Sequence, residues 1–483
     1  MRARRVAWLL ALIEACSLLT ARAAVKPGLE GAQELFRQNH WEEARRHLRS
    51  QWALIPEKDR AAATFLIGRS HVREAEFYRA TRRFGDEAGL AYLGELVAAS
   101  ESRRVVWIPL FKGLYQVDAD RNAEGARTLA AVSQSALPAP WKATARLRRA
   151  LALHRLGRVP EAAGLLKESS PEARFAALLA SGTAEPPAAS GTGPREKLLT
   201  AAVLFRAGRA GEAEALVSAT NLDLPDVEDK SAPKKLLRFH DPGLASAWER
   251  ICWERAVVAL TPLAVSGAGT EASLAAYYAG LSLFSLGVPD EAAKLLKGAN
   301  GSALGPQLQP SLRLLLAACA WQSRPPAAAE LASLWEGSQG QPDAVLLWDE
   351  LRRSGFAKLE PFATKLDARL RDLLQSSSAE RPSGALVGRW GLSRLRHGEG
   401  EAALLSALSE YRDKSNKNKL EWNDPLLLLA LSAADYRGNQ YAQALETLFE
   451  LSKTFPGLRP LQWNLQGIYA ARQKAGGEAR ISQ

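Results

Sequence analysis

Small and apolar residues return along the chain in a fixed order: a small residue, a turn, and then Ala near the start of a second helix. The clearest copy is Asp424–Pro456. There Ser432 is small enough to let two helices approach closely, and Tyr441 and Leu448 fill the gap between them. Ala444 faces the partner helix where the two cross. Because apolar positions on one helical face recur every three to four residues, the pattern predicts a helix–turn–helix unit.

The same spacing recurs along most of the chain. Asn39 and Ala44 repeat the register of Asn439 and Ala444. Many copies that share one internal spacing are a far stronger signal than a single match. The residues expected to pack the helices of these units together are Ala44, Ala126, Ala162, Ala213, Gly280, Ala292, Gly391, Ala403 and Ala444.

These units resemble the tetratricopeptide repeat (TPR), a helix–turn–helix of roughly 34 residues that stacks into a solenoid. The resemblance implies an all-α fold, a right-handed superhelical solenoid of antiparallel helix pairs. It also implies that each unit packs only on its neighbours, so that no single central core forms. The copies are degenerate, and several are spaced by more than the family's period. The prevalence of Ala, Leu, Arg and Glu agrees with a helical fold.

Clusters of Gly and Pro interrupt the repeats, as connections between helices require. The division that they predict is a signal peptide at 1–23, TPR-like repeats at 24–181, a linker-rich segment with one repeat at 182–242, central helical repeats at 243–375, a linker at 376–384 and C-terminal repeats at 385–483.

The N-terminus has the three parts of an export signal. Arg2, Arg4 and Arg5 form a basic start, Val6–Leu19 is mostly apolar, and Ala21–Ala23 offers small residues for cleavage. The apolar run is shorter than the roughly 20 residues of a membrane-spanning helix. We therefore expect a soluble protein in the periplasm or outside the cell. The alternative is an uncleaved amphipathic helix.

Cysteine usage leaves two questions open. Cys16 ends the segment Ile13–Cys16, which loosely resembles a bacterial lipobox, so lipidation and an outer-membrane lipoprotein are the alternative to cleavage after Ala23. Peripheral or lipid-anchored membrane association would follow from that alternative. Cys252 and Cys319 would remain, either as inert core residues, which we favour, or as a disulfide.

Neither charge nor motifs point to nucleic acid or catalysis. The formal net charge is +11, but the basic residues are spread over most predicted helices, and only Arg412–Lys419 concentrates them. No nucleic-acid-binding module is recognisable. The chain has no HExxH, no Gly-rich phosphate loop and no GxSxG segment. We expect a protein that is not an enzyme and has no cofactor or metal.

The resemblance also proposes a binding surface, since the first helices of stacked units line a concave groove in that family. In this register the groove-facing candidates are Phe205, Tyr277, Phe284 and Tyr436, with Arg155, Arg206, Arg396 and Arg437 at the ends of the same helices. Arginine and aromatic side chains together suit a peptide with acidic and apolar groups. The competing explanation is that a cation in the last turn is favoured by the helix dipole alone.

The combined expectation is a non-enzymatic interaction scaffold in a bacterial cell envelope, which docks other envelope proteins or peptides. The first alternative is an accessory lipoprotein or assembly factor of a pilus, secretin, polysaccharide-export or surface-motility machine. The second is a helical module that binds peptidoglycan or another glycan through exposed tryptophans, for which the candidates are Trp41, Trp107, Trp141, Trp248, Trp335 and Trp422.

Overall fold

The architecture is all-helical in the part of the chain that the computed structural model describes. Apart from a few isolated positions between 364 and 408, that part is 27–98, 107–118, 121–132, 137–156, 158–165, 194–220, 244–321, 324–353, 357–362, 387–392 and 424–461. No strand occurs in these ranges, so the expected all-α solenoid class is confirmed there.

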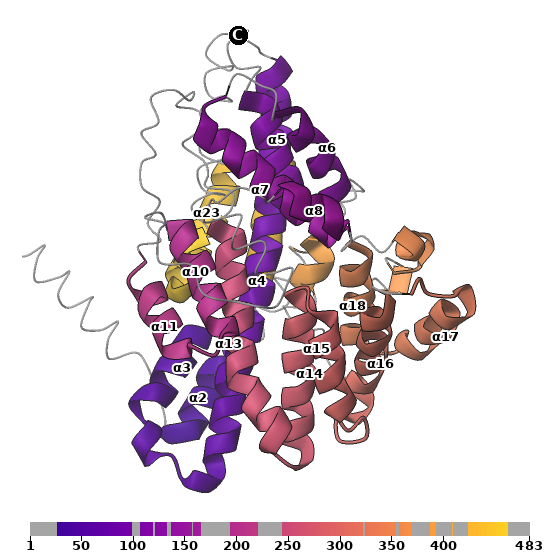
Figure 1. Ribbon diagram of the computed structural model, residues 1–483. Coiled ribbons are helices and arrows are strands. Elements are labelled where there is room, and N and C mark those ends of the chain that lie inside the picture. The colour runs from indigo at the N-terminus through magenta and orange to yellow at the C-terminus, as the bar shows by residue number, and fades with distance from the viewer. Residues whose placement is uncertain are drawn as a thin grey trace, which may run out of the picture.

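Several pairs of consecutive helices in the described ranges form antiparallel hairpins joined by short turns (Figure 1). A further helical segment covers 387–392. The α-helices are α2 (Gly28–Arg37), α3 (Trp41–Ser50), α4 (Glu57–Ala98), α5 (Trp107–Asp118), α6 (Asn122–Val132), α7 (Ala139–Arg155), α8 (Val159–Leu165), α10 (Pro194–Arg206), α11 (Ala210–Ser218), α13 (Leu244–Ser266), α14 (Gly269–Ser285), α15 (Pro289–Gly298), α16 (Gly305–Trp321), α17 (Ala328–Ser338), α18 (Pro342–Arg353), α22 (Pro425–Arg437) and α23 (Tyr441–Thr454). The 3₁₀-helices in the described ranges are η1 (Trp52–Leu54), η3 (Ala357–Phe362) and η4 (Pro456–Leu461).

One turn geometry joins the two helices of six hairpins in the described chain. In each hairpin a backbone amide donates to the carbonyl five residues earlier, over 2.8–3.0 Å, and the next helix begins at the following residue. This bond satisfies carbonyl groups that the end of the first helix leaves without a partner. The donors are His40, Arg121, Arg158, Arg209, Val288 and Gln440.

The carbonyl of each donor residue then accepts from the amide four residues on, which is the first bond of the second helix. The residues at that position are Ala44, Gly125, Ala162, Ala213, Ala292 and Ala444. They have small side chains because the two helices of the hairpin cross there. In the α5–α6 hairpin the position belongs to Gly125, one residue before the Ala126 expected from sequence, and a methyl group on Gly125 would overlap Val117. Ala126 itself is buried.

Other small residues lie where helices approach most closely. A methyl group on Gly280 in α14 would overlap Leu296 of α15, and one on Gly391 would lie 3.2 Å from the Cβ of Ala430. Ser432 donates a 2.9 Å hydrogen bond to the carbonyl of Ala444, which joins α22 to α23. Ala403 lies outside the described residues.

The residue before each of four donors has a positive φ, which L-residues other than Asn and Gly adopt at a cost. Asn39 and Asn439 have φ of 62° and 61°, and Gly208 and Gly287 have 75° and 82°. The sequence therefore supplies the two residue types that tolerate this conformation.

Replacing Asn439 by Ala should lower the free energy of unfolding by about 1 kcal/mol, because Ala resists the left-handed conformation. Asn439→Gly removes the same side chain, including its 2.7 Å hydrogen bond from the Tyr441 hydroxyl, yet adopts positive φ freely. Urea denaturation of both variants separates the two effects. Equal losses would show that the side-chain bond, and not backbone strain, makes Asn439 important.

Helix α4 gives the molecule a central element that the repeat pattern did not predict. It packs along α13 and also contacts α2, α3, α5, α14, α22 and η4 (Figure 1). The largest buried cluster accordingly runs from Trp41 to Leu458 and joins early and late hairpins. The expectation that units pack only on their neighbours, without a common core, is therefore wrong. At the closest crossing, a methyl group on Gly68 of α4 would overlap Leu260 of α13.

The described residues answer one of the two cysteine questions and leave the other open. Cys252 and Cys319 are both free and buried, and burial raises the pKa of each thiol. Cys16, the remainder of the predicted signal peptide at 1–23 and the predicted linker at 376–384 lie outside the described residues. Among the helices that are described, none combines the length and apolar character needed to cross a bilayer.

Candidate functional site

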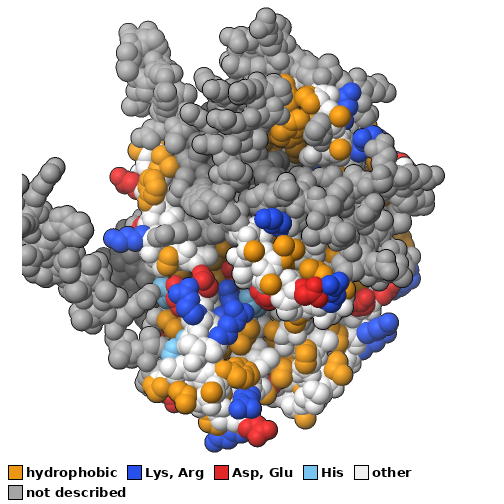
Figure 2. Space-filling model, turned by 60° about the vertical axis from the view of Figure 1, so that its left-hand side comes forward, with side chains coloured by type: hydrophobic (Ala, Val, Ile, Leu, Met, Phe, Trp, Pro, Cys, Tyr) orange, Lys and Arg blue, Asp and Glu red, His pale blue; other side chains and the backbone are white. Residues whose placement is uncertain are grey.

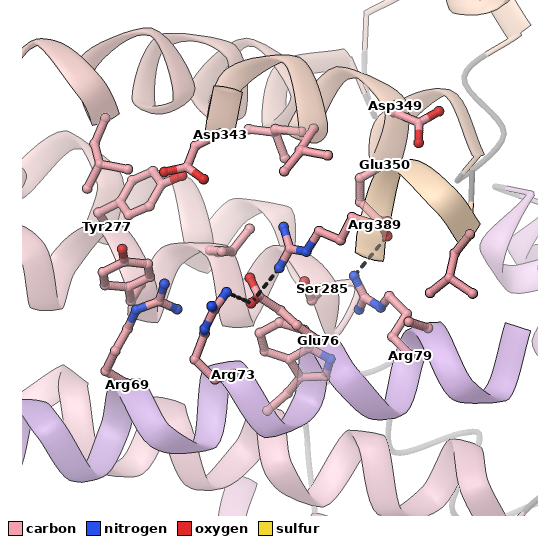
Figure 3. Close-up of a pocket in the computed structure, with 18 of the residues that line it drawn as sticks. Arg69, Arg73, Glu76, Arg79, Tyr277, Ser285, Asp343, Asp349, Glu350 and Arg389 are labelled. Carbon is pink, nitrogen blue, oxygen red and sulfur yellow. Dashed lines mark hydrogen bonds and ion pairs between the residues drawn. The ribbon is translucent and has the colours of Figure 1, made fainter. Parts of the chain in front are cut away.

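A cavity of about 160 Å³ lies between α4, α13, α14, α16, α18, α22 and the 387–392 segment (Figure 3). Its most charged wall is one face of α4, where Arg69, Arg73, Glu76 and Arg79 follow one another at spacings of four, three and three residues. This is the spacing that brings side chains onto a single face of a helix. The intervening residues of α4, such as Val72 and Ala75, are buried against neighbouring helices.

Glu76 is the centre of the charged wall. Its carboxylate lies 2.6 Å from Nη2 of Arg389 and 3.3 Å from Nη1 of Arg73 (Figure 3). Burial by itself would raise the pKa of Glu76, but Arg389, Arg69 and Arg73 outweigh burial and lower the pKa from 4.5 to about 2. The three arginines around Glu76 thus outnumber its single negative charge on this wall.

Arg79 closes one end of the wall through two acidic partners. Its guanidinium lies 2.7 Å from Glu249 of α13 and 3.0 Å from Glu350 of α18. Arg82 also contacts Glu249, at 2.8 Å, and Trp253 donates to the same carboxylate over 3.2 Å. Because these groups come from three helices, their bonds hold α4, α13 and α18 in a defined arrangement.

The remaining surface of the cavity is aromatic, aliphatic and acidic. The guanidinium carbon of Arg69 lies 3.9 Å from the ring centre of Tyr278, a cation–π contact. Tyr277 lies beside Tyr278, with ring centroids 5.0 Å apart. Asp343 of α18 lines the cavity on the side opposite α4 (Figure 3). The aliphatic residues that line the cavity are Leu281, Leu308, Leu346, Leu347 and Leu392.

Two of the eight residues that the sequence nominated for partner binding, Tyr277 and Arg437, lie together in this cavity. Tyr436 and Phe205 are buried, and Phe284 packs half-buried against the main core. The structure thus divides the nominated aromatic residues between the cavity and the core.

The nominated arginines other than Arg437 do not converge on the cavity. Arg206 lies 2.8 Å from the carboxylate of Glu254 on α13, and it is 3.6 Å from Glu291. Its charge is thus already matched within the fold. Arg396 and the side chain of Arg155 lie outside the described residues.

The glycan hypothesis rested on tryptophans exposed at the surface, and that expectation is wrong for three of them. Trp41, Trp107 and Trp335 are 4%, 7% and 7% exposed. They pack in hydrophobic clusters because their rings fill the space between helices. Trp141 and Trp248 are half-buried, and Trp422 lies outside the described residues.

Sequence reasoning missed the arginine face of α4, although its spacing is visible in the sequence. Arg69, Arg73 and Arg79 precede the recognisable repeats of the central region and belong to a helix longer than any repeat helix. The repeat pattern points to the ends of repeat helices, whereas these three arginines lie within the long helix α4. The contribution of Arg389 could not be inferred, because it depends on the packing of the 387–392 segment.

A second buried charged group lies on another face of α4. Arg45 of α3 lies 2.7 Å from Glu74, and His71 lies 3.7 Å from the same carboxylate. Burial lowers the pKa of His71 well below its ordinary value, and Arg45, Arg255 and Arg49 lower it further. These groups connect α3 to α4 inside the protein. In the described ranges, no set of His, Cys, Asp and Glu side chains is arranged to hold a metal ion.

On the face shown in Figure 2, acidic and basic side chains of the described residues lie next to one another, with apolar side chains between them. The basic side chains of the described residues are therefore not gathered into one broad area on that face. Arginines of the described chain also line the α4 wall of the cavity.

The fold and the cavity define a class: an all-α protein of antiparallel helix hairpins around a long central helix. No family model matches the sequence, and no curated protein matches it either. The TPR domain of P58(IPK) is 13% identical, with a TM-score of 0.22 over 77% of this chain and 99% of that chain. Yeast Tom70 is 13% identical, with a TM-score of 0.33 over 94% of this chain and 96% of that chain. At these scores neither likeness assigns a function or a partner.

Proposed function

We propose that this chain is a non-enzymatic interaction scaffold that binds another protein or peptide at the cavity between α4, α14, α18 and α22. The observation that carries the proposal is the composition of that cavity. Arginine and aromatic side chains from helices far apart in the sequence converge there, on a frame of repeated hairpins. Arginine and aromatic residues contribute disproportionately to protein–protein binding.

Arg437 offers a starting point for a partner. It stands in the last turn of α22, lines the cavity, and forms no ion pair with any residue that the structure describes. A carboxylate from a partner would therefore gain a charge-assisted hydrogen bond there without displacing an internal one. A partner carboxylate at Arg206 would instead have to displace Glu254, with which Arg206 already forms an ion pair.

The proposed location is a bacterial cell envelope, with other envelope proteins or peptides as partners. The support is the basic start, apolar run and small residues of 2–23. The alternative is an accessory lipoprotein or assembly factor of an envelope machine, anchored through Cys16. Mass spectrometry of the N-terminal peptide separates the two, because the first requires a chain that starts at Ala24 and the second a diacylated Cys16.

The scaffold proposal predicts site-specific cross-linking. A photoreactive amino acid at Leu392, which lines the cavity, should capture the same protein in repeated envelope preparations. The matched control position is Glu212, which lies on the exposed surface of α11. Excess unlabelled chain should compete the product away, and Arg437→Glu should lower its yield at least tenfold, since charged hydrogen bonds contribute about 1.5–3 kcal/mol. Equal products at both positions would contradict the proposal.

A further inference from the structure

The cavity has walls of opposite charge. On the α4 side, Arg69, Arg73 and Arg389 surround Glu76, so three guanidinium groups face one carboxylate. Asp343 faces them from α18 (Figure 3). A binding site with this arrangement favours a ligand that carries both charges, with its negative end toward α4 and its positive end toward α18.

The basic wall has unused capacity for an anion. Glu76 is shared between Arg73 and Arg389, and Arg79 is bonded to Glu249 and Glu350. Arg69 stacks on Tyr278 but forms no ion pair within the described residues, and its Nη1 is buried without a hydrogen-bond partner. A buried guanidinium N–H without an acceptor is unfavourable, so a ligand carboxylate beside Arg69 would relieve an existing penalty.

The acidic wall is likewise available. Asp343 is exposed and lines the cavity, and it forms no hydrogen bond or ion pair with the rest of the described chain. The charge of Asp343 nevertheless acts on Arg389 across the cavity. Burial lowers the pKa of Arg389, but Glu76 and Asp343 outweigh burial and raise it. A ligand ammonium group beside Asp343 would contact a carboxylate that has no ion-pair partner within the described residues.

The size and lining of the cavity restrict the rest of the ligand. Its volume of about 160 Å³ is close to that of an engineered cavity that holds one benzene molecule, about 150 Å³. Leu281, Leu308 and Leu346 supply an apolar surface between the charged walls. The space suits one group of amino-acid size with a short aliphatic part, so a protein partner would place no more than a single residue in it.

We propose that this cavity binds a free amino acid as a zwitterion, with its carboxylate at Arg69 and Arg73, its ammonium group at Asp343 and its aliphatic part against the leucines. This ligand goes beyond the scaffold function and does not require it, and a free amino acid and a partner residue would compete for the same cavity. A simple carboxylate would leave Asp343 without a partner, and a simple amine would meet the repulsion of the α4 wall.

Isothermal titration calorimetry of the full chain tests the site with free amino acids as probes. The panel is leucine, 4-aminobutyrate and 6-aminohexanoate, which differ in the distance between ammonium and carboxylate. For the amino acid that binds, the matched carboxylic acid and the matched amine should each bind at least tenfold more weakly, because each lacks one charged contact. An acetylated and amidated dipeptide should not bind. Binding by the capped dipeptide would assign the cavity to a protein segment instead.

Two substitutions locate the binding energy. Arg69→Gln and Asp343→Asn should each weaken binding at least tenfold. Arg158→Gln, which breaks only an exposed ion pair with Glu161 on α8, should leave binding unchanged. Arg69 packs on Tyr278, so Arg69→Gln is interpreted only if its helix content and melting match those of the wild type. Because Asp343 is exposed, Asp343→Asn should leave the fold intact, and its effect on binding decides whether the proposal holds.

Three outcomes would overturn the proposal: no binding by any amino acid of the panel, equal binding by the matched carboxylic acid, or unchanged affinity in Asp343→Asn. None of these affects the cross-link at Leu392, which reports on the scaffold function. Conversely, loss of that cross-link would leave the amino-acid site standing.

Discussion

Trp348→Ala is expected to lower the free energy of unfolding by about 3–5 kcal/mol, the range for removing a buried aromatic side chain. Trp348 is 0% exposed and belongs to α18, the helix that carries Asp343 and Glu350. Its ring lies 5.3 Å from that of Phe362 and 5.6 Å from that of Trp335, centroid to centroid. The truncation would therefore leave a cavity between three elements that cannot collapse independently.

Denaturant unfolding followed by circular dichroism measures this loss. Trp52→Ala is the matched control, because Trp52 is 36% exposed and lies in η1, away from the main core. The control should change stability by less than about 0.5 kcal/mol. Trp348→Phe should lose less than Trp348→Ala, since Phe refills most of the volume. Similar small losses for Trp348→Ala and Trp52→Ala would mean that α18 is not packed as described.

Glu76→Gln is expected to lower stability by about 3 kcal/mol at pH 7, because a pKa lowered from 4.5 to about 2 corresponds to about 1.4 kcal/mol for each unit. Above pH 4.5 the carboxylate is charged in both folded and unfolded chains, and its full contribution is present. As pH falls from 4.5 toward 2, the unfolded chain takes up the proton first, so the contribution is lost. The difference between wild type and Glu76→Gln should therefore shrink over that window.

Urea titrations at pH 7, 5 and 3 measure the window directly. Glu212→Gln is the control, since Glu212 forms an exposed ion pair with Arg209. A difference between wild type and Glu76→Gln that stays constant from pH 7 to pH 3 would show that Glu76 acts through packing. If wild type and Glu76→Gln had the same free energy of unfolding at pH 7 and at pH 5, the three arginines would not stabilise the charge of Glu76.

The hairpins could be predicted from sequence because their determinants are local. Asn39 and Asn439 were paired by spacing alone, and both occupy the same positive-φ position in the structure. Ala44 and Ala444 likewise follow equivalent turn hydrogen bonds. All residues that define such a turn lie within ten positions of one another, so the turn can be recognised from a short sequence pattern.

The cavity could not be predicted in the same way, because it depends on contacts across hundreds of residues. The face formed by Arg69, Arg73 and Arg79 is visible as a periodic pattern in one helix. Nothing in that pattern indicates that Arg389 would lie 2.6 Å from Glu76, or that Asp343 would face them. Similarly, the sequence does not indicate that Arg206 lies 2.8 Å from Glu254, because that proximity is a property of helix packing.

The position of α4 has a consequence for the making of this protein on the ribosome. The hydroxyl of Tyr78 in α4 donates over 3.4 Å to the carbonyl of Gly457, 379 residues later in the chain. At about 5–20 residues per second, translation takes roughly 20–75 seconds to cover that distance. During that interval, one side of α4 lacks the partners that cover it in the finished fold. A nascent chain that stops before α22 would leave this apolar surface of α4 exposed to association with other chains. The fold would then be completed when the C-terminal helices pack onto α4, and not by adding one repeat after another.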